Sequence, residues 1–142
     1  MTELAFHFNA PDRIAYACRL LRKAVGSGAR VVVTGSEATL SQLDVDLWTF
    51  SPADFVPHAT ANSEPSLVEA SPVFLGTNLE TIPHHQILLN LGATVPSGFE
   101  RFERVIEVVG LDDEDRLSAR GRWKHYADLG YAITRHDLNL KA

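Results

Sequence analysis

Residues 29–40 read ARVVVTGSEATL, and this stretch decides the class of fold. Its three consecutive valines stand between glycines, a pattern typical of a strand that is buried on both faces of a parallel sheet. Leu40, Leu43 and Leu47 then recur at helical spacing, which predicts a helix directly after the strand. A strand of this kind followed at once by a helix indicates an α/β domain.

The segments on either side continue the alternation of strand and helix. Residues 3–8, ELAFHF, predict a first strand, and Ile14, Cys18, Leu21 and Val25 recur at the spacing of one helical face. Further strands are predicted at residues 72–76, 85–92 and 103–110, a short helical turn at 97–102, and a final short strand or tail at 131–136. We therefore predict a three-layer, Rossmann-like α/β domain with a mostly parallel sheet of about five strands.

The composition limits the class of protein further. The 142 residues suffice for one domain, 1–142, and the net charge of -5 argues against broad wrapping of nucleic acid. Cys18 is the only cysteine, so an internal disulfide is impossible. No apolar run approaches the roughly 20 residues that span a bilayer, and the N-terminus does not resemble a secretory signal. We expect a cytoplasmic protein that does not contact the membrane.

The sequence offers little support for a cofactor or a metal. The strand at residues 31–34 is followed by neither G-x-G-x-x-G nor a P-loop, so no nucleotide is expected, and Gly35 is interpreted as a tight turn. His84 and His85 are adjacent and would point to opposite faces of a strand, which disfavours a shared metal ion. A small-molecule or nucleotide-binding enzyme on the same fold is the alternative hypothesis.

A basic helical face stands out in this acidic chain. Residues 111–131 read LDDEDRLSARGRWKHYADLGY, where Asp112 is expected to cap a helix and the next acids to complement its dipole. Arg122 and His125 are predicted to point away from the basic face. At 100° per residue, one face roughly 100° wide collects Arg116, Arg120, Trp123, Lys124 and Ala127.

Two interpretations of this face remain open from its spacing alone. It is either a solvated surface or a site for a hydrophobic peptide that carries carboxylates, because arginine donates in a fork that matches a carboxylate. A second candidate surface lies at LWTFSPADFVPH, at the start of a Pro-rich segment, residues 49–72, that is predicted to be a long loop. The large apolar side chains there either cap the core or dock a partner.

The blocks LWTFSPADFVPH and ARGRWKHYADLGY together resemble the chi subunit family of the bacterial DNA polymerase III holoenzyme. The resemblance covers nearly the whole chain and includes the ARVVV and QILLNL segments. It implies a Rossmann-like fold without nucleotide chemistry, no cofactor, and no catalytic residue, although the family is catalogued within a DNA-directed DNA polymerase. The implied role is an accessory subunit in DNA replication.

The resemblance also implies two partners. One is the acidic C-terminal tail of single-stranded DNA-binding protein, which ends in Pro-Phe, and the other is the psi subunit of the clamp loader. The implied tail site consists of Arg116, Arg120, Trp123 and Lys124, with Val109, Gly130 and Tyr131 nearby. The implied psi surface includes Trp48, Phe55, Val56 and Pro57, and a helicase is an alternative partner at the same surface.

On this interpretation the chain links the clamp loader to coated single-stranded DNA and contacts DNA mainly indirectly. The family often has Lys where Arg116 stands and Tyr where Trp123 stands, and both differences preserve charge and aromaticity. A module that binds bare nucleic acid directly through the basic helix is a further rival, which the acidic net charge disfavours.

Overall fold

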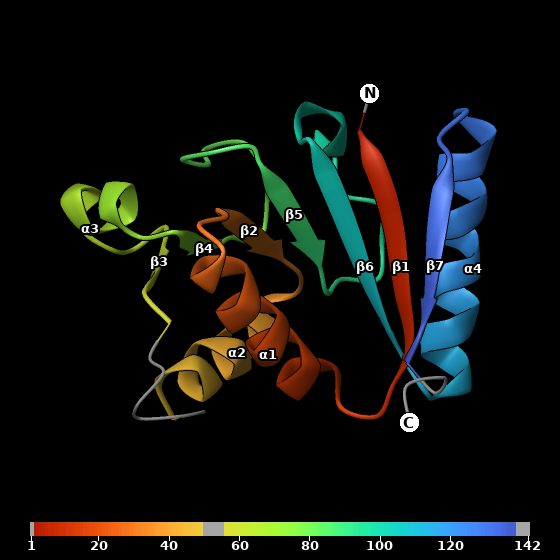
Figure 1. Cartoon of the computed structure of the whole chain (residues 1–142), viewed down its shortest axis with the longest axis horizontal. Coiled ribbons are helices and arrows are strands. Elements are labelled where there is room, and N and C mark those ends of the chain that lie inside the picture. Colours follow the sequence, from red (N-terminus) through yellow and green to blue (C-terminus); the bar gives the residue numbers. More distant parts are fainter. Residues whose placement is uncertain (1, 50–55, 139–142) are drawn as a thin grey trace.

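Seven parallel strands form one sheet in the computed structural model, which describes residues 2–49 and 56–138 (Figure 1). Within these residues the strand order is β3-β4-β2-β5-β6-β1-β7, and each neighbouring pair is parallel. The strands are β1 (Glu3–Ala10), β2 (Val31–Thr34), β3 (His58–Thr60), β4 (Val73–Leu75), β5 (Ile87–Asn90), β6 (Arg104–Gly110) and β7 (Ile133–Asp137).

Helices cover both faces of this sheet. Figure 1 shows α1 and α2 on one face, while α4 runs along β1 and β7 on the other. The helices are α1 (Arg13–Gly26), α2 (Glu37–Thr49), α3 (Pro65–Ala70) and α4 (Asp113–Asp128), with a short 3-10 helix η1 (Phe99–Arg101). The predicted three-layer α/β fold is confirmed.

The valines of β2 show why the sheet needs a helical layer on each side. Successive side chains of a strand point to opposite faces. Val31 and Val33 accordingly pack in the apolar cluster that contains α1 and α2, whereas Val32 packs in the cluster that contains α4. All three valines are buried, as the sequence predicts for a strand covered on both faces.

Two of the long helices, α1 and α4, begin after aspartates that cap them. The Asp12 side chain accepts a hydrogen bond from the Ala15 backbone N at 3.0 Å, and Asp112 accepts one from Asp115 N at 2.7 Å. These bonds satisfy amide groups that have no partner inside the first helical turn. The prediction that Asp112 caps the last helix is therefore confirmed.

The sheet contains more strands than the predicted five, and the difference lies partly in residues 49–72. This segment was expected to be one long loop, but it holds β3 and α3. Pro65 suits the first position of α3, since its missing N–H would have no helical partner there. The three residues of β3 form a strand because they pair with β4. Local sequence patterns do not predict such a pairing.

The histidines also lie differently from the expected arrangement. His84 and His85 precede β5 rather than lie on it; His84 is buried and His85 exposed. Among the described residues, neither ring nitrogen of His84 has a hydrogen-bond partner, and burial, assisted by the charge of Arg30, lowers the pKa of this imidazole. His58 is buried, and its Nε2 lies 2.6 Å from the Asp44 carboxylate.

Two further features concern the residues that the structure describes. Burial, with Asp46 and Asp12 as smaller causes, raises the pKa of the Cys18 thiol to about 11, which agrees with an inert interior residue. None of the helices in residues 2–49 and 56–138 is long and apolar enough to cross a membrane.

Candidate functional site

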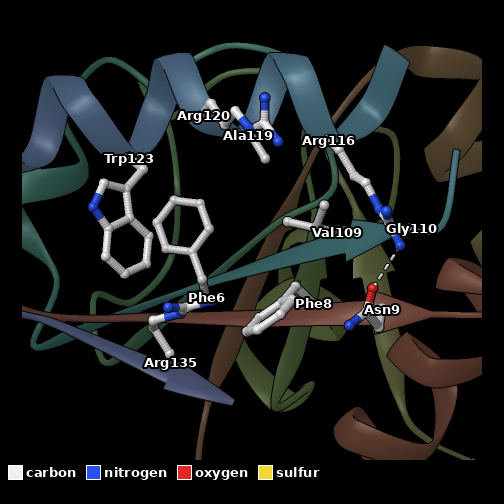
Figure 2. Close-up of a pocket in the computed structure, with 10 residues that line it drawn as sticks. All are labelled: Phe6, Phe8, Asn9, Val109, Gly110, Arg116, Ala119, Arg120, Trp123 and Arg135. Carbon is white, nitrogen blue, oxygen red and sulfur yellow. Dashed lines mark hydrogen bonds between the residues drawn. The ribbon is translucent and has the colours of Figure 1, made fainter. Parts of the chain in front are cut away.

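A cavity of about 700 Å³ lies between α4 and the strands beneath it. It is close to the carboxyl ends of β1 and β6, the edge where open α/β sheets commonly bind ligands. Figure 2 shows side chains from the helix on one side and from the strands on the other. The lining residues are Phe6, Phe8, Asn9, Val109, Gly110, Arg116, Ala119, Arg120, Trp123 and Arg135.

The interior of the cavity is apolar and aromatic. The ring centroids of Phe6 and Trp123 lie 5.0 Å apart at an interplanar angle of 55°, a tilted aromatic contact. Phe6 and Val109 are buried, and Trp123 is half-buried at the edge of the same apolar cluster. A partly exposed aromatic surface backed by a rigid core can receive an apolar side chain of a ligand.

The rim of the cavity is strongly basic. Arg116 and Arg120 come from α4 and Arg135 comes from β7, and within the part of the chain that the structure describes no acid lines the cavity. A guanidinium presents a fork of donors that fits a carboxylate, and apolar surroundings strengthen its attraction for an anion. An acidic protein thus concentrates three arginines around one apolar cavity, an arrangement suited to an anionic ligand with an apolar group.

Asn9 holds one of these arginines in place. Arg116 donates to Oδ1 of Asn9 at 2.8 Å, and Nδ2 of Asn9 donates to Oδ1 of Asp137 at 2.8 Å (Figure 2 shows the first bond). Asn9 has φ +66, in the left-handed region that asparagine tolerates better than most residues, and it lies between His7 and Ala10, where the register of β1 shifts against β6. The irregular end of β1 therefore aims this amide at α4.

A buried polar cluster fixes α4 against the sheet. Glu107 of β6 is wholly buried and accepts from Arg122 Nε at 2.9 Å, Tyr126 Oη at 2.7 Å and Asn90 Nδ2 at 2.9 Å. Burial raises the pKa of Glu107, while the Arg122 guanidinium and the hydrogen bonds oppose that rise. Burial likewise raises the pKa of Tyr126, so its hydroxyl stays protonated and donates to the carboxylate.

This cluster sets the rotation of α4 about its own axis. Arg122 also donates to Ser118 Oγ at 2.7 Å, and Ser118 donates to the Ala93 carbonyl at 2.9 Å, so one side of the helix is tied inward. Because Arg122 and Tyr126 point into the core, Arg120 and Trp123 must face the neighbouring cavity.

The structure brings four of the seven predicted tail-site residues together. Arg116, Arg120, Trp123 and Val109 line the cavity. The remaining three lie beyond its lining: Lys124 is exposed on α4, Gly130 takes φ +92 just after the helix, and Tyr131 packs against Phe99 with ring centroids 5.4 Å apart.

Apart from Val109 of β6, the strand side of the cavity was missed by sequence reasoning. Phe6, Phe8, Asn9 and Arg135 come from β1 and β7, which are neighbours in the sheet but lie at opposite ends of the chain. The alternation of Leu4, Phe6 and Phe8 was visible in ELAFHF and indicates one apolar face. No local pattern indicated that this face lies under α4. Arg122, predicted only to point away from the basic face, points into the core.

The second predicted surface lies around the end of α2. Trp48 is 61% exposed and its ring meets His58 edge-on with centroids 5.5 Å apart, and Pro57 is exposed. Val56 is only 3% exposed and packs in the core, as the alternative interpretation of this block expects. Phe55 lies outside the residues that the structure describes.

Comparisons with known proteins agree with the resemblance. The family model described as DNA polymerase III chi subunit, HolC, matches residues 1–134. A DNA polymerase III subunit chi of Pseudomonas aeruginosa is 34% identical over 127 residues, which cover 89% of this chain and 87% of the relative. A protein of the same name from Haemophilus influenzae is 29% identical over 126 residues, covering 86% and 85%.

Proposed function

The chain belongs to the DNA polymerase III chi subunit family, and from this premise we propose that its basic cavity binds the acidic C-terminal tail of single-stranded DNA-binding protein. The family places it among the accessory subunits of DNA replication. The proposal adds a specific ligand, a peptide that carries carboxylates and ends in an aromatic residue.

One observation carries this proposal: three arginines surround an aromatic cavity whose lining, among residues 2–49 and 56–138, contains no acid. A nucleotide would find the positive charge but no glycine loop at the end of a strand. Bare DNA needs a broad positive surface, whereas this protein has a net charge of -5. A short acidic peptide with one apolar anchor matches both the small size and the mixed character of the cavity.

The expected affinity follows from the two kinds of contact. Burying an aromatic side chain against Trp123 and Phe6 contributes about 1.5–3 kcal/mol. Each charge-assisted hydrogen bond from an arginine contributes roughly 1.5–3 kcal/mol. Loss of translational freedom and ordering of the peptide offset much of this gain, which leaves a dissociation constant of about 1 μM. Such a contact exchanges readily, and many tails on one DNA strand raise the avidity.

Calorimetry with synthetic tail peptides tests the proposal. The wild-type chain is titrated with the acidic tail peptide, with the same peptide lacking its terminal Phe, and with a peptide of scrambled order. We expect binding of the first and a loss of at least about tenfold for the second, because the apolar anchor is gone. Equal affinity for the intact and scrambled peptides would show that only net charge is recognised and would refute a tail-specific site.

We further propose that the psi subunit of the clamp loader binds around Trp48 and Pro57. Trp48 and Val45 are 61% and 56% exposed on α2, and large exposed apolar side chains favour a protein interface. α2 covers the opposite face of the sheet from α4, so a psi subunit and a tail peptide could bind at the same time (Figure 1). This separation supports a linking role, and a helicase is the competing partner for the α2 surface.

The rival functions predict different outcomes in simple assays. A module that binds nucleic acid directly would shift a bare oligonucleotide in an electrophoretic assay without single-stranded DNA-binding protein. An enzyme that uses a nucleotide would be stabilised by nucleotides in a thermal-unfolding screen. We expect neither effect.

A further inference from the structure

Arg135 projects from the edge strand β7 on the side of the cavity opposite α4. Its guanidinium carbon lies 5.0 Å from the centroid of the Phe8 ring and 6.0 Å from that of Trp123. The residue is exposed and lines the cavity. Within residues 2–49 and 56–138, no carboxylate forms an ion pair with it.

The two aromatic contacts leave the donors of Arg135 available. A guanidinium stacks through its face and donates hydrogen bonds in its own plane. Contacts with Phe8 and Trp123 therefore restrain the side chain without using its N–H groups. A side chain that is restrained before binding loses less conformational entropy when a ligand arrives.

Arg135 also differs in position from the arginines of the helix. Arg116 and Arg120 reach the cavity from α4, whereas Arg135 reaches it across Phe8 from the strand side (Figure 2). Cations on two opposite sides favour a ligand whose carboxylates flank its apolar group. A ligand with one anionic end would leave one side without a partner.

We propose that Arg135 contacts the bound ligand and donates to one of its carboxylates from the side opposite Arg116 and Arg120. This inference rests on the proposed function, because its ligand is the acidic tail peptide. Either the terminal carboxylate or an acidic side chain of the peptide supplies the acceptor. Arg135 is then a determinant of specificity that acts together with the helical face.

The test measures peptide affinity in Arg135→Gln, with Arg104→Gln as a matched control. Arg104 is an exposed arginine on β6 that pairs with Glu3 at 3.2 Å and does not line this cavity, so its replacement removes the same charge elsewhere. We expect Arg135→Gln to weaken binding about tenfold and Arg104→Gln to change it less than about twofold. Equal affinities of Arg135→Gln and wild type would overturn the inference.

Two peptide variants identify the acceptor through double-mutant cycles. If Arg135 donates to the terminal carboxylate, Arg135→Gln will hardly weaken the binding of a peptide whose C-terminal carboxylate is replaced by an amide. If it donates to an acidic side chain, Arg135→Gln will still weaken the binding of the C-terminally amidated peptide. It will no longer weaken the binding of a peptide whose aspartates are replaced by asparagine. If Arg135→Gln weakened the binding of both peptide variants as much as that of the unmodified peptide, Arg135 would not contact a carboxylate of the ligand. The inference would then be wrong.

Arg135→Lys guards against a purely structural explanation. Lysine preserves the charge but lacks the planar fork, so we expect an affinity between those of wild type and Arg135→Gln. If both variants lose thermal stability to the same degree while affinity stays equal to wild type, Arg135 only covers Phe8. If wild type binds the peptide and Arg120→Ala weakens it but Arg135→Gln does not, this inference fails alone. Absence of wild-type binding removes the proposed function as well.

Discussion

Arg122 and Glu107 form an ion pair in the interior, with Nε and Oε1 2.9 Å apart and side chains that are 3% and 0% exposed. The pair connects α4 to β6, the strand whose end contributes Val109 and Gly110 to the cavity. Its geometry therefore determines which face of the basic helix lines the cavity. A buried pair is costly to desolvate, so its structural value is best tested by breaking it.

Glu107→Gln is expected to destabilise the fold by about 3–5 kcal/mol, since it leaves the Arg122 charge buried without an opposite charge beside it. Urea denaturation of wild type and variant measures the difference in free energy of unfolding. Glu3→Gln is the matched control, because Glu3 pairs with Arg104 at 3.2 Å on the exposed surface and its loss should cost less than about 1 kcal/mol. Equal costs for the two substitutions would contradict the structural role of the buried pair.

His84 should make the protein less stable in mild acid. Its pKa is lowered by burial from the ordinary value of 6.5, so the unfolded chain takes up a proton at a higher pH than the folded chain. The resulting stability is present above pH 6.5 and is lost as the pH falls through the lower pKa of the folded protein. Between about pH 7.5 and 5.5, the free energy of unfolding of His84→Leu should fall less than that of wild type. Urea denaturation at both pH values measures this difference.

The exposed His125 provides the control for this measurement. His125→Gln should retain the acid sensitivity of wild type, because it leaves the buried His84 unchanged. If His84→Leu and wild type showed the same pH dependence, the acid sensitivity would originate elsewhere.

Arg120→Ala is expected to weaken binding of the tail peptide at least about tenfold, because it removes a charge-assisted contact from the helical side of the cavity. Fluorescence anisotropy with a labelled peptide measures the dissociation constant. Arg22→Ala is a suitable comparison, since this exposed arginine of α1 lies on the other face of the sheet. A folded Arg120→Ala protein with wild-type affinity would remove this residue from the site.

Salt should weaken the peptide contact but not abolish it. Raising the ionic strength from 0.1 M to 1 M shortens the Debye length from about 10 Å to about 3 Å, which screens the arginines from the carboxylates. The apolar contact with Trp123 and Phe6 is not screened in this way, so residual binding should remain. A titration in which affinity is independent of salt would argue against recognition by a basic rim.

The two tryptophans allow the two proposed surfaces to be separated. Trp123→Ala should reduce tail-peptide affinity at least about tenfold and leave psi binding unchanged. Trp48→Ala should have the opposite effect, because Trp48 belongs to α2 on the other face of the sheet. Calorimetry with the peptide and with purified psi subunit tests both variants. Loss of both activities in either variant, with the fold intact, would refute two independent surfaces.

Local sequence patterns predicted the helical half of the site. Arg116, Arg120 and Trp123 share a face because helical geometry is fixed by neighbours three and four residues apart, and the Asp112 cap is equally local. The buried β2 strand and the alternation of strands and helices were predictable for the same reason. The short β3 and α3 were not, because β3 exists through its pairing with β4.

The sequence by itself determined the α/β class, the basic helical face and the resemblance to a replication family. Only the tertiary structure decided what that face meets. Strand pairing brings β1 and β7, from opposite ends of the chain, beneath α4, so Phe8 and Arg135 complete the cavity. The partner of Arg122 was likewise decided by contacts between distant parts of the chain. The Glu107 side chain is buried beside Arg122 only because β6 lies between β5 and β1 in the sheet.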